Sequence, residues 1–411
     1  MKKILYASIL IPLCLQLFAC SNRTAEATQP LVKAAEKTDP NPIEKKYADL
    51  AVRIVRDSVG VKPGDVVIIS GGKHTIPLME ALAIESNKLG GFANLFLSSD
   101  RVDRSYYLDV PDKFLAQEQR YYAEWYKHTN VLINMPGAED QKATFADVPE
   151  ERFAKASKAY EFFTQIINQL PIRQIYINYP SKQDAANAKL DYETYEKMIW
   201  DGINADYKAI SLTGNTLKQQ LQNSKSVRVT TAAGTDVSFS IGQRPVFVGD
   251  GIVTEEEAKT KIFMMRTAGL PDGQVIVAPI ETSANGKIVI PKSTCNFAPM
   301  TNVSFDLKNG KMENFKAATG ADCFAKQMAP YDGPKDMFGR FSIGLNPALK
   351  VNEDTADFRP GVGAGVVGIA IGGNEYAGGS NKTFGGASFQ ITNATVEIDG
   401  KVVVKDGKLV P

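Results

Sequence analysis

The first half of the chain alternates between short apolar runs and stretches with helical periodicity. Residues 66–70, 92–97 and 131–135 are nearly continuous apolar runs, which are typical of strands buried on both faces of a sheet. Around them, apolar residues recur at the spacing of one helical face, as in residues 43–59 and 76–89. This order predicts an α/β fold with a doubly wound, mostly parallel sheet.

The pattern changes to strict alternation near residue 220. Residues 227–241 alternate around a glycine-containing turn, residues 302–317 alternate around an Asn-Gly pair, and the end of the chain carries two Asp-Gly pairs. Asn-Gly and Asp-Gly favour the tight turns of antiparallel hairpins. We therefore expect an α/β domain at residues 43–220, followed by a β-rich α+β domain at residues 221–411.

The N-terminal segment has the pattern of an export signal. Two lysines precede an apolar run over residues 4–18, which is shorter than the roughly 20 residues of a spanning helix and fits a signal peptide. The run ends in Leu-Phe-Ala-Cys, which resembles the lipobox of bacterial lipoproteins. This predicts a signal peptide at residues 1–19 and a lipid on Cys20. The alternative is an ordinary signal peptide with an incidental cysteine.

The residues after this cysteine predict a tether and a destination. Residues 20–42 contain almost no large apolar side chains and cannot bury enough surface to offset the entropy of ordering them. Ser21 and Asn22 follow Cys20, and no aspartate there indicates retention in the inner membrane. We expect an exported protein attached to a membrane through the lipid on Cys20, with the outer membrane favoured over the inner.

Charge and cysteine content limit the partners and the covalent structure. The formal net charge is +1, and residues 1–19 contain two lysines and no acid, so the remainder carries 1 − 2 = −1. A nearly neutral chain without a basic stripe argues against nucleic acid as a partner. Apart from Cys14 and Cys20, only Cys295 and Cys323 remain. A disulfide between them and two separate buried thiols are equally compatible with the sequence.

Histidine is scarce, which restricts the chemistry available to the chain. The only two histidines are His74 and His128, so any chemistry in the last two-thirds must proceed without imidazole. His74 follows the first apolar run, where the strands of a doubly wound sheet bind ligands at their carboxyl ends. A strand-to-helix turn with an exposed histidine is the simpler interpretation of this segment, and the one we favour.

The order of motifs resembles the thermophilic metalloaminopeptidases of the aminopeptidase T and aminopeptidase S type. The resemblance begins with a helix, a Lys-Pro-Gly-Asp turn and a strand over residues 47–69, and continues through residues 271–290, 338–350 and 365–386. It implies a peptidase scaffold whose members form dimers. Members of that family hold two metal ions through two glutamates, two histidines, a tyrosine and an aspartate. Two such metals polarise the peptide carbonyl and activate a water.

Transferred position by position, this ligand set is mostly missing. Glu281 matches the first glutamate, although an ordinary surface carboxylate is the alternative. The other ligand positions, which we call the former metal-site positions, fall at or near Arg340 (second glutamate), Gly368 (first histidine), Glu375 beside Tyr376 (tyrosine), and Gly386 and Ser388 (the last histidine and aspartate). A guanidinium cannot bind a metal but can pair with a carboxylate through two hydrogen bonds. We therefore expect an ion pair between Glu281 and Arg340. The alternative is that Arg340 points to solvent or binds a ligand carboxylate in the old cleft.

Two functional hypotheses follow from this resemblance. The first is a lipid-anchored, catalytically silent envelope protein that binds a ligand in the old cleft, with a peptide suggested by the family and no cofactor. The second is an enzyme. It would be a metal-dependent aminopeptidase with an altered site, using zinc, cobalt or manganese, or another activity on the same fold. The absence of histidine from the whole region favours the first hypothesis.

Overall fold

The computed structural model describes residues 42–410, except positions 119, 150, 154, 157–165, 168, 223, 296–297 and 351–361. Residues 42–411 form one compact unit. The predicted signal peptide and nearly all of the predicted tether, including Cys20, lie outside the described residues.

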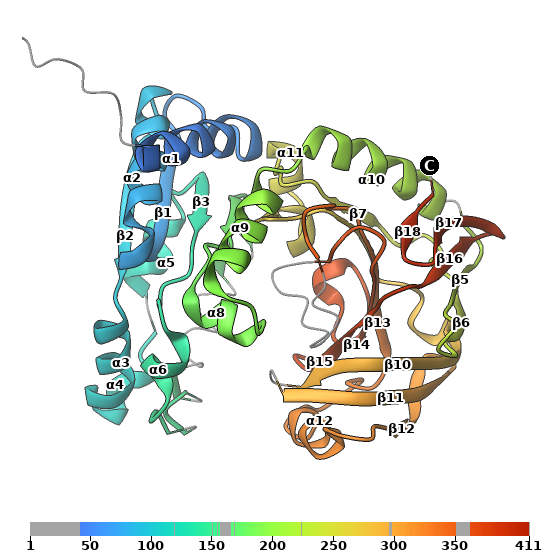
Figure 1. The fold of residues 1–411 in the computed structure, drawn as a ribbon. Coiled ribbons are helices and arrows are strands. Elements are labelled where there is room, and N and C mark those ends of the chain that lie inside the picture. Colours follow the sequence, from blue (N-terminus) through green and yellow to red (C-terminus); the bar gives the residue numbers. More distant parts are fainter. Residues whose placement is uncertain are drawn as a thin grey trace, which may run out of the picture. The chain divides into compact units, whose positions relative to one another are not determined.

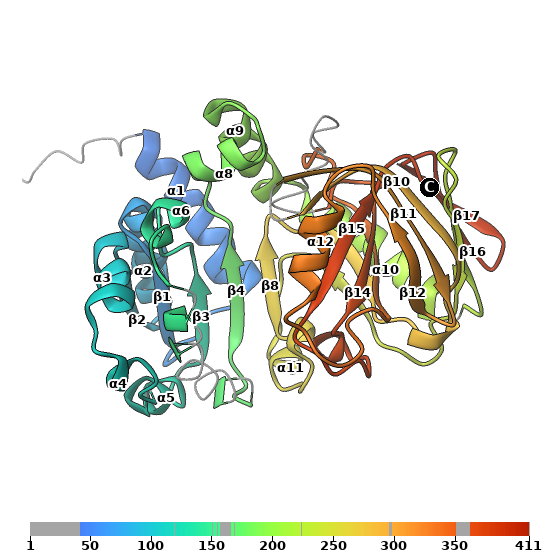
Figure 2. The ribbon, with the colours of Figure 1, turned by 90° about the horizontal axis from the view of Figure 1, so that it is seen from below.

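A five-stranded parallel sheet forms the first part of this unit. Its strand order is β2-β1-β3-β4-β8, with β1 (Val66–Gly72), β2 (Phe92–Ser98), β3 (Val131–Asn134), β4 (Arg173–Ile177) and β8 (Thr267–Leu270). Neighbouring strands are all parallel, which confirms the α/β fold. The edge strand β8 comes from far beyond residue 220 and lies next to β4 (Figure 2). The chain therefore returns to this sheet after its first hairpin.

Helices cover this sheet because their apolar faces match its buried strands. Side chains of α1, α2 and α9 pack with those of β1, β3 and β4 in one hydrophobic core, and Figure 1 shows these helices beside the sheet. The described helices before the second part are α1 (Pro42–Arg53), α2 (Ile76–Lys88), α3 (Asp100–Asp109), α4 (Asp112–Leu115), α5 (Arg120–Tyr126), α6 (Gln141–Phe145), α8 (Lys182–Asn187) and α9 (Tyr192–Ile203), with a π-helical turn at Ile54–Ser58 and a 3-10 turn at Lys73–Thr75.

Two antiparallel sheets make up most of the second part, as the alternating pattern predicts. One has the order β12-β11-β10-β6-β5-β16-β17-β18, and the other has the order β15-β14-β13-β9-β7. The first contains β5 (Val227–Thr230), β6 (Asp236–Phe239), β10 (Asn285–Cys295), β11 (Ala298–Lys308), β12 (Lys311–Lys316), β16 (Thr395–Ile398), β17 (Lys401–Lys405) and β18 (Lys408–Leu409). The second contains β7 (Val246–Gly249), β9 (Gln274–Val277), β13 (Phe338–Gly344), β14 (Val367–Gly372) and β15 (Gly386–Ile391).

The two antiparallel sheets share one hydrophobic core with two helices. Ile288 of β10, Phe341 of β13 and Phe389 of β15 are fully or almost fully buried in it. The apolar faces of α10 (Tyr207–Gln222) and α12 (Ala321–Met328) pack against the same core. A short helix α11 (Glu255–Ala258) and a 3-10 turn at Phe263–Met265 lead into β8.

Three predicted hairpin turns are present. In each, both central residues have positive φ, which is the requirement of a type I′ turn and explains the Asn-Gly and Asp-Gly pairs. They are Asn309-Gly310 between β11 and β12 (φ 48° and 78°), Asp399-Gly400 between β16 and β17 (50° and 82°), and Asp406-Gly407 between β17 and β18 (47° and 75°).

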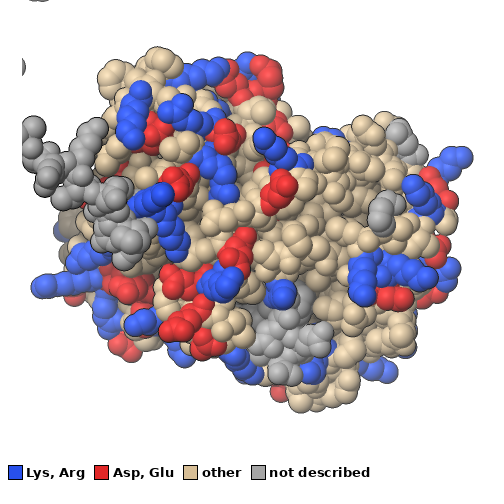
Figure 3. All heavy atoms as spheres, turned by 45° about the horizontal axis from the view of Figure 1, so that its top comes forward, with Lys and Arg blue, Asp and Glu red and all other residues tan. Residues whose placement is uncertain are grey.

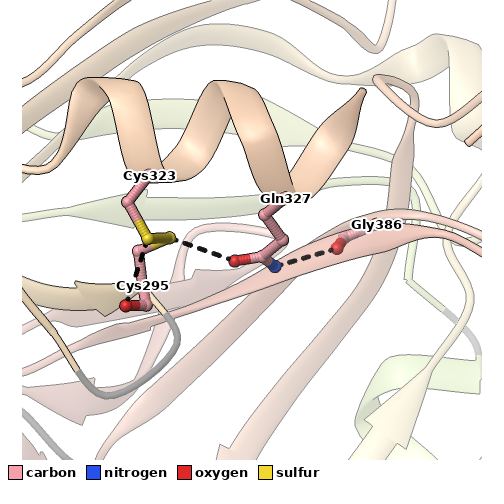
Figure 4. Close-up of a disulfide and its surroundings, with 4 residues drawn as sticks. All are labelled: Cys295, Cys323, Gln327 and Gly386. Carbon is pink, nitrogen blue, oxygen red and sulfur yellow. Dashed lines mark hydrogen bonds between the residues drawn. A yellow bond between two sulfur atoms is a disulfide. The ribbon is translucent and has the colours of Figure 1, made fainter. Parts of the chain in front are cut away.

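A disulfide joins Cys295 at the end of β10 to Cys323 in α12, with their Cα atoms 6.1 Å apart, so the first of the two alternatives holds. Gln327 extends from the same helix (Figure 4). Its Oε1 lies 3.3 Å from Cys295 Sγ, and since a disulfide sulfur carries no hydrogen, this is a close contact. Its Nε2 donates to the carbonyl of Gly386 at 3.5 Å. The helix α12 is thereby linked to both antiparallel sheets.

The surface shows no concentration of one charge on the face drawn in Figure 3. Lysine and arginine are interspersed with acidic residues over the described α/β part, and the described β-rich part of this face is mostly uncharged. Among the described residues, no helix is both long enough and apolar enough to cross a lipid bilayer.

Candidate functional site

Strand register gathers most of the former metal-site positions on one face of the five-stranded antiparallel sheet. Arg340 on β13 pairs with Ala370 on β14, which pairs with Ser388 on β15. Gly368 and Gly386 lie two residues from these partners and therefore on the same face, because side chains alternate along a strand. The intervening residues, such as Phe341, point into the core. These positions thus face away from the eight-stranded sheet.

A cavity of about 510 Å³ lies against this face. Its wall includes Glu375 and Tyr376 from the 3-10 turn η5 (Glu375–Ala377), together with Gly386 and Ser388. Phe384, whose side chain is fully exposed, borders this cavity. It also borders a larger one of about 1120 Å³ that reaches the carboxyl ends of the parallel strands. Three of the former metal-site positions, Glu375, Gly386 and Ser388, therefore adjoin a space large enough for a small ligand, whereas Arg340 and Gly368 are not part of its wall.

Glu281 is a buried carboxylate, not a surface one. It lies in the 3-10 turn η4 (Glu281–Ser283) after β9 and keeps only 6 % of its surface exposed. Its Oε1 accepts hydrogen bonds from Asn374 Nδ2 at 3.0 Å and from the backbone N–H of Ser380 at 2.6 Å. Burial raises the pKa of this carboxyl, but the hydrogen bonds from Ser380 and Asn374 outweigh burial and leave the pKa below its usual value.

The cation that neutralises Glu281 is Arg244. Arg244 Nη2 lies 2.7 Å from Glu281 Oε2, and Arg244 Nη1 donates to the carbonyl of Gly378 at 2.6 Å. The expected pair between Glu281 and Arg340 is therefore wrong. Arg244 lies in the loop between β6 and β7, outside every motif of the family resemblance. The only signal that could have suggested it was the general need of a buried carboxylate for a cation.

Two asparagines, Asn374 and Asn381, stabilise the loop whose groups donate hydrogen bonds to Glu281. Asn374 Nδ2 also donates to the carbonyl of Gly339, next to Arg340. Asn374 Oδ1 accepts from the backbone N–H of Asn381, whose side chain in turn bonds two further backbone carbonyls. Both asparagines are buried. Sequence reasoning missed this network, because asparagine in a glycine-rich loop is an equally ordinary turn residue.

Arg340 has a different environment from Arg244. Its Nη1 donates to the hydroxyl of Tyr376 at 3.5 Å and its Nη2 to the hydroxyl of Ser388 at 3.3 Å. Its Nε is buried and has no hydrogen-bond partner among the described residues. Glu375, which precedes Tyr376 in the chain, lies 3.9 Å from the amine of Lys382 instead. No described carboxylate forms an ion pair with Arg340, whose guanidinium contacts only neutral oxygens.

The side chains at these positions do not fit a pair of metal ions. Within the described ranges, no group of three or more histidine, cysteine, aspartate or glutamate side chains is arranged to hold a metal. Both oxygens of Glu281 are engaged by other residues, and Arg340 offers only donors. At Gly368, a Cβ atom would lie 2.3 Å from Ser342 Oγ. A side chain at that position would therefore require the hydroxyl of Ser342 to move.

The turn after β1 is present as predicted, but its histidine is not exposed. A Cβ at Gly72 would lie 2.1 Å from the carbonyl oxygen of Gly137, so close backbone packing explains this glycine. The ring of His74 packs edge-on against Tyr179, with centroids 5.6 Å apart, and burial lowers the pKa of His74. His74 lines neither of the two cavities described above.

Comparison with known proteins identifies the scaffold. The sequence model of the thermophilic metalloprotease family M29 matches residues 42–350. The chain belongs to this family. The matched range includes Glu281 and Arg340, while the other former metal-site positions lie beyond it. The resemblance drawn from the motifs is thereby confirmed. A search of curated proteins found no match.

Two solved structures share the fold of this M29 member. One is wild-type AmpT from Thermus thermophilus, with a TM-score of 0.67 and 13% identity, covering 90% of this chain and 100% of that one. The other is 2,5-dihydroxypyridine dioxygenase from Pseudomonas putida KT2440, with a TM-score of 0.57 and 14% identity, covering 89% and 97%. At such identities the likeness establishes the architecture, an α/β part followed by a β-rich part, and leaves the chemistry open.

Proposed function

We propose that this M29-family chain binds a peptide in its cleft and does not hydrolyse it with a metal pair. The observation that carries the proposal is the presence of two guanidinium groups, one at a former metal-ligand position and one paired with the remaining glutamate. Arg340 stands at the second glutamate position, and Arg244 neutralises Glu281. Two divalent ions beside two guanidinium groups would repel them strongly in a partly buried site. The former catalytic centre is therefore suited to a ligand rather than to metals.

The walls of the larger cavity suit a peptide. Aromatic rings from Tyr176, Tyr376 and Phe384 offer apolar contact. The amide side chains of Asn134 and Gln174 each make one hydrogen bond within the protein, to Ser70 and Tyr176, and each amide has further capacity for a peptide backbone. A mixture of apolar surface and a few placed polar groups is what ligand sites generally present. The family's substrate class and this lining agree on the same type of ligand.

We expect no cleavage of aminoacyl anilides by the purified full chain with zinc, cobalt or manganese added, because the imidazole ligands are missing. The measurement is release of the anilide chromophore over hours, with Glu281→Ala as the matched control.

In parallel, a pool of tripeptides is equilibrated across a dialysis membrane with the protein, and retained peptides are identified by mass spectrometry. Retention without cleavage supports the proposal.

Two results would contradict the proposed function. Metal-dependent turnover that disappears in Glu281→Ala would establish the alternative, an active metal-dependent aminopeptidase with an altered site. Retention of no peptide by the wild-type chain would remove the ligand-binding function.

Self-association into a dimer, which the family resemblance suggests, is measured in the same preparation by sedimentation.

The proposal includes attachment to the cell envelope through lipid on Cys20. Support comes from the lipobox-like sequence and from the poorly apolar residues that follow it. We expect Cys20→Ala to abolish incorporation of labelled palmitate and to move the protein out of the membrane fraction. Cys14→Ala, which alters a cysteine of the predicted signal peptide, is the matched control and should leave labelling intact. Equal labelling of Cys20→Ala and wild type would refute the lipid anchor.

A further inference from the structure

Arg340 carries a charge that the described part of the protein leaves without a counterion. The side chain is half-buried, and its two hydrogen bonds, at 3.5 and 3.3 Å, go to neutral hydroxyls. A guanidinium has five N–H donors, and its partners here accept two of them. By contrast, the half-buried Arg244 beside it has a carboxylate at 2.7 Å. The difference between these two arginines is what needs an explanation.

We propose that Arg340 binds a carboxylate group of the ligand, with the hydroxyls of Tyr376 and Ser388 beside it. This inference rests on the proposed peptide-binding function and specifies which group of the peptide is recognised. The family resemblance implies metal cations at this place. Here the fixed cation is a side chain, so the ligand must bring the negative charge.

The sheet register leaves Arg340 room to act in this way. Arg340, Ala370 and Ser388 lie side by side on β13, β14 and β15. The middle strand carries only Gly368, Ala370 and Gly372 on this face, so the long arginine side chain passes over β14 and reaches Ser388. Tyr376 and Ser388, which hold the guanidinium, both line the cavity of about 510 Å³. The terminal nitrogens are therefore held at the edge of that cavity.

Unsatisfied polar atoms are concentrated around this position. Arg340 Nε, Ser342 Oγ and Gln390 Oε1 are all buried, and none has a hydrogen-bond partner among the described residues. Ser342 and Gln390 flank Gly368 on the neighbouring strands. Each such atom carries a desolvation cost that folding alone does not offset. Two of them, Arg340 Nε and the hydroxyl of Ser342, can donate to a bound carboxylate, whereas Gln390 Oε1 is an acceptor that a carboxylate does not satisfy.

The surrounding charges favour a carboxylate over a phosphate. No lysine or arginine forms part of the wall of the cavity of about 510 Å³, which includes the acid Glu375, and Arg340 reaches this wall through its hydrogen bonds to Tyr376 and Ser388. A single guanidinium matches one negative charge and binds two parallel oxygens through its planar fork. A doubly charged phosphate would need a second cation, which the cavity wall does not supply. Such a carboxylate can come from the C-terminus of a peptide or from an acidic side chain.

The test uses matched peptides and the full chain. Tripeptides are supplied in pairs as the free acid and the C-terminal amide, and a second set of amides compares glutamate with glutamine. In one of the two sets, the peptide with the carboxylate should be retained about tenfold or more better than its amide partner, as expected for a charged hydrogen-bonded contact. A preference in the first set identifies the C-terminal carboxylate, and a preference in the second identifies an acidic side chain. Arg340→Gln should remove this preference while still binding the amides. Arg340→Lys should keep part of it, since lysine retains the charge but not the fork.

Controls separate the outcomes. Lys382→Gln removes an exposed cation near the same cavity and should leave the preference unchanged, and near-ultraviolet circular dichroism verifies that each variant is folded. The inference is overturned if acids and amides are retained equally by wild type, or if the preference survives in Arg340→Gln. It is also overturned if inorganic phosphate displaces the peptides at lower concentration than acetate does. Equal retention of acids and amides leaves the proposed peptide-binding function standing, whereas retention of no peptide removes both.

Discussion

Replacing Arg244 with methionine is expected to lower the free energy of unfolding by about 3 kcal/mol at neutral pH, near the lower end for breaking a buried ion pair. Methionine keeps most of the apolar volume of the arginine stem, so the change removes mainly charge and hydrogen bonds. The carboxylate of Glu281 would remain, with 8 % of its side chain exposed. We place the effect near the lower end because the Arg244 side chain is 21 % exposed, which weakens the interaction by solvent screening.

A double-mutant cycle isolates this pair. Urea unfolding of Arg244→Met, Glu281→Gln and the double variant should show that the double change costs less than the sum of the single changes. The matched control is Arg228 and Asp236, which form a similar pair at 2.8 Å with both side chains about half exposed. Arg228→Met should cost much less than Arg244→Met, because solvent screens an exposed pair. Additive costs for Arg244 and Glu281 would contradict the role of the pair.

The loss of stability caused by Arg244→Met is expected to become smaller as the pH is lowered. The pKa of Glu281 is lowered in the folded protein, so this carboxylate contributes stability above its unfolded pKa and loses it as pH falls through the folded value. Without Arg244, protonation of Glu281 relieves the uncompensated charge. The difference in stability between wild type and Arg244→Met should therefore shrink as the pH is lowered from neutral towards the usual pKa of a glutamate. A difference that grows in acid would show that another group is responsible.

Arg340→Met tests whether Arg340 or Arg244 is the counterion of Glu281. The sequence-based hypothesis assigned the counterion role to Arg340 because this residue stands at a ligand position. The structure gives that role to Arg244. Arg340→Met combined with Glu281→Gln should show additive costs, because the two side chains make no direct contact among the hydrogen bonds and ion pairs of the described residues.

Local elements could be predicted from the sequence because their causes are local. The Asn309-Gly310 turn follows from two adjacent residues that tolerate positive φ. The first strand follows from a run of branched apolar residues, and the predicted strand at residues 66–70 lies within β1 (Val66–Gly72). The family motifs placed Arg340 and Ser388 near one site, and strand register brings them within hydrogen-bond distance.

Long-range pairing could not be predicted in the same way. The strand β8 joins the parallel sheet beside β4, although about ninety residues separate them along the chain; nothing in its four residues indicates a partner. Arg244 and Glu281 are 37 positions apart and come from two different loops. Which arginine meets a given carboxylate depends on loop conformation and on which sheet face each strand presents. Spacing along the sequence determines neither.

Removing the disulfide should destabilise the protein by about 3.5 kcal/mol, because the bond closes a loop of 28 residues and restricts the unfolded chain. The test is urea unfolding of the double variant Cys295→Ala/Cys323→Ala. Its midpoint should fall, and its dependence on urea should steepen, because an unfolded chain without the cross-link exposes more surface. Wild type treated with dithiothreitol should behave like the double variant. The double variant itself should not respond to the reductant.

The position of the disulfide adds a second consequence. It fixes α12 to β10, and Gln327 of this helix contacts both Cys295 and the carbonyl of Gly386 at the cavity wall (Figure 4). The double variant should therefore show faster backbone amide exchange in α12 and at the start of β15 than in the parallel sheet, since local openings follow the loss of tethering contacts. Mass spectrometry of a non-reduced digest should recover the peptides of Cys295 and Cys323 as one linked species. Recovery of two free peptides, with unchanged unfolding in dithiothreitol, would contradict a structural disulfide in this protein.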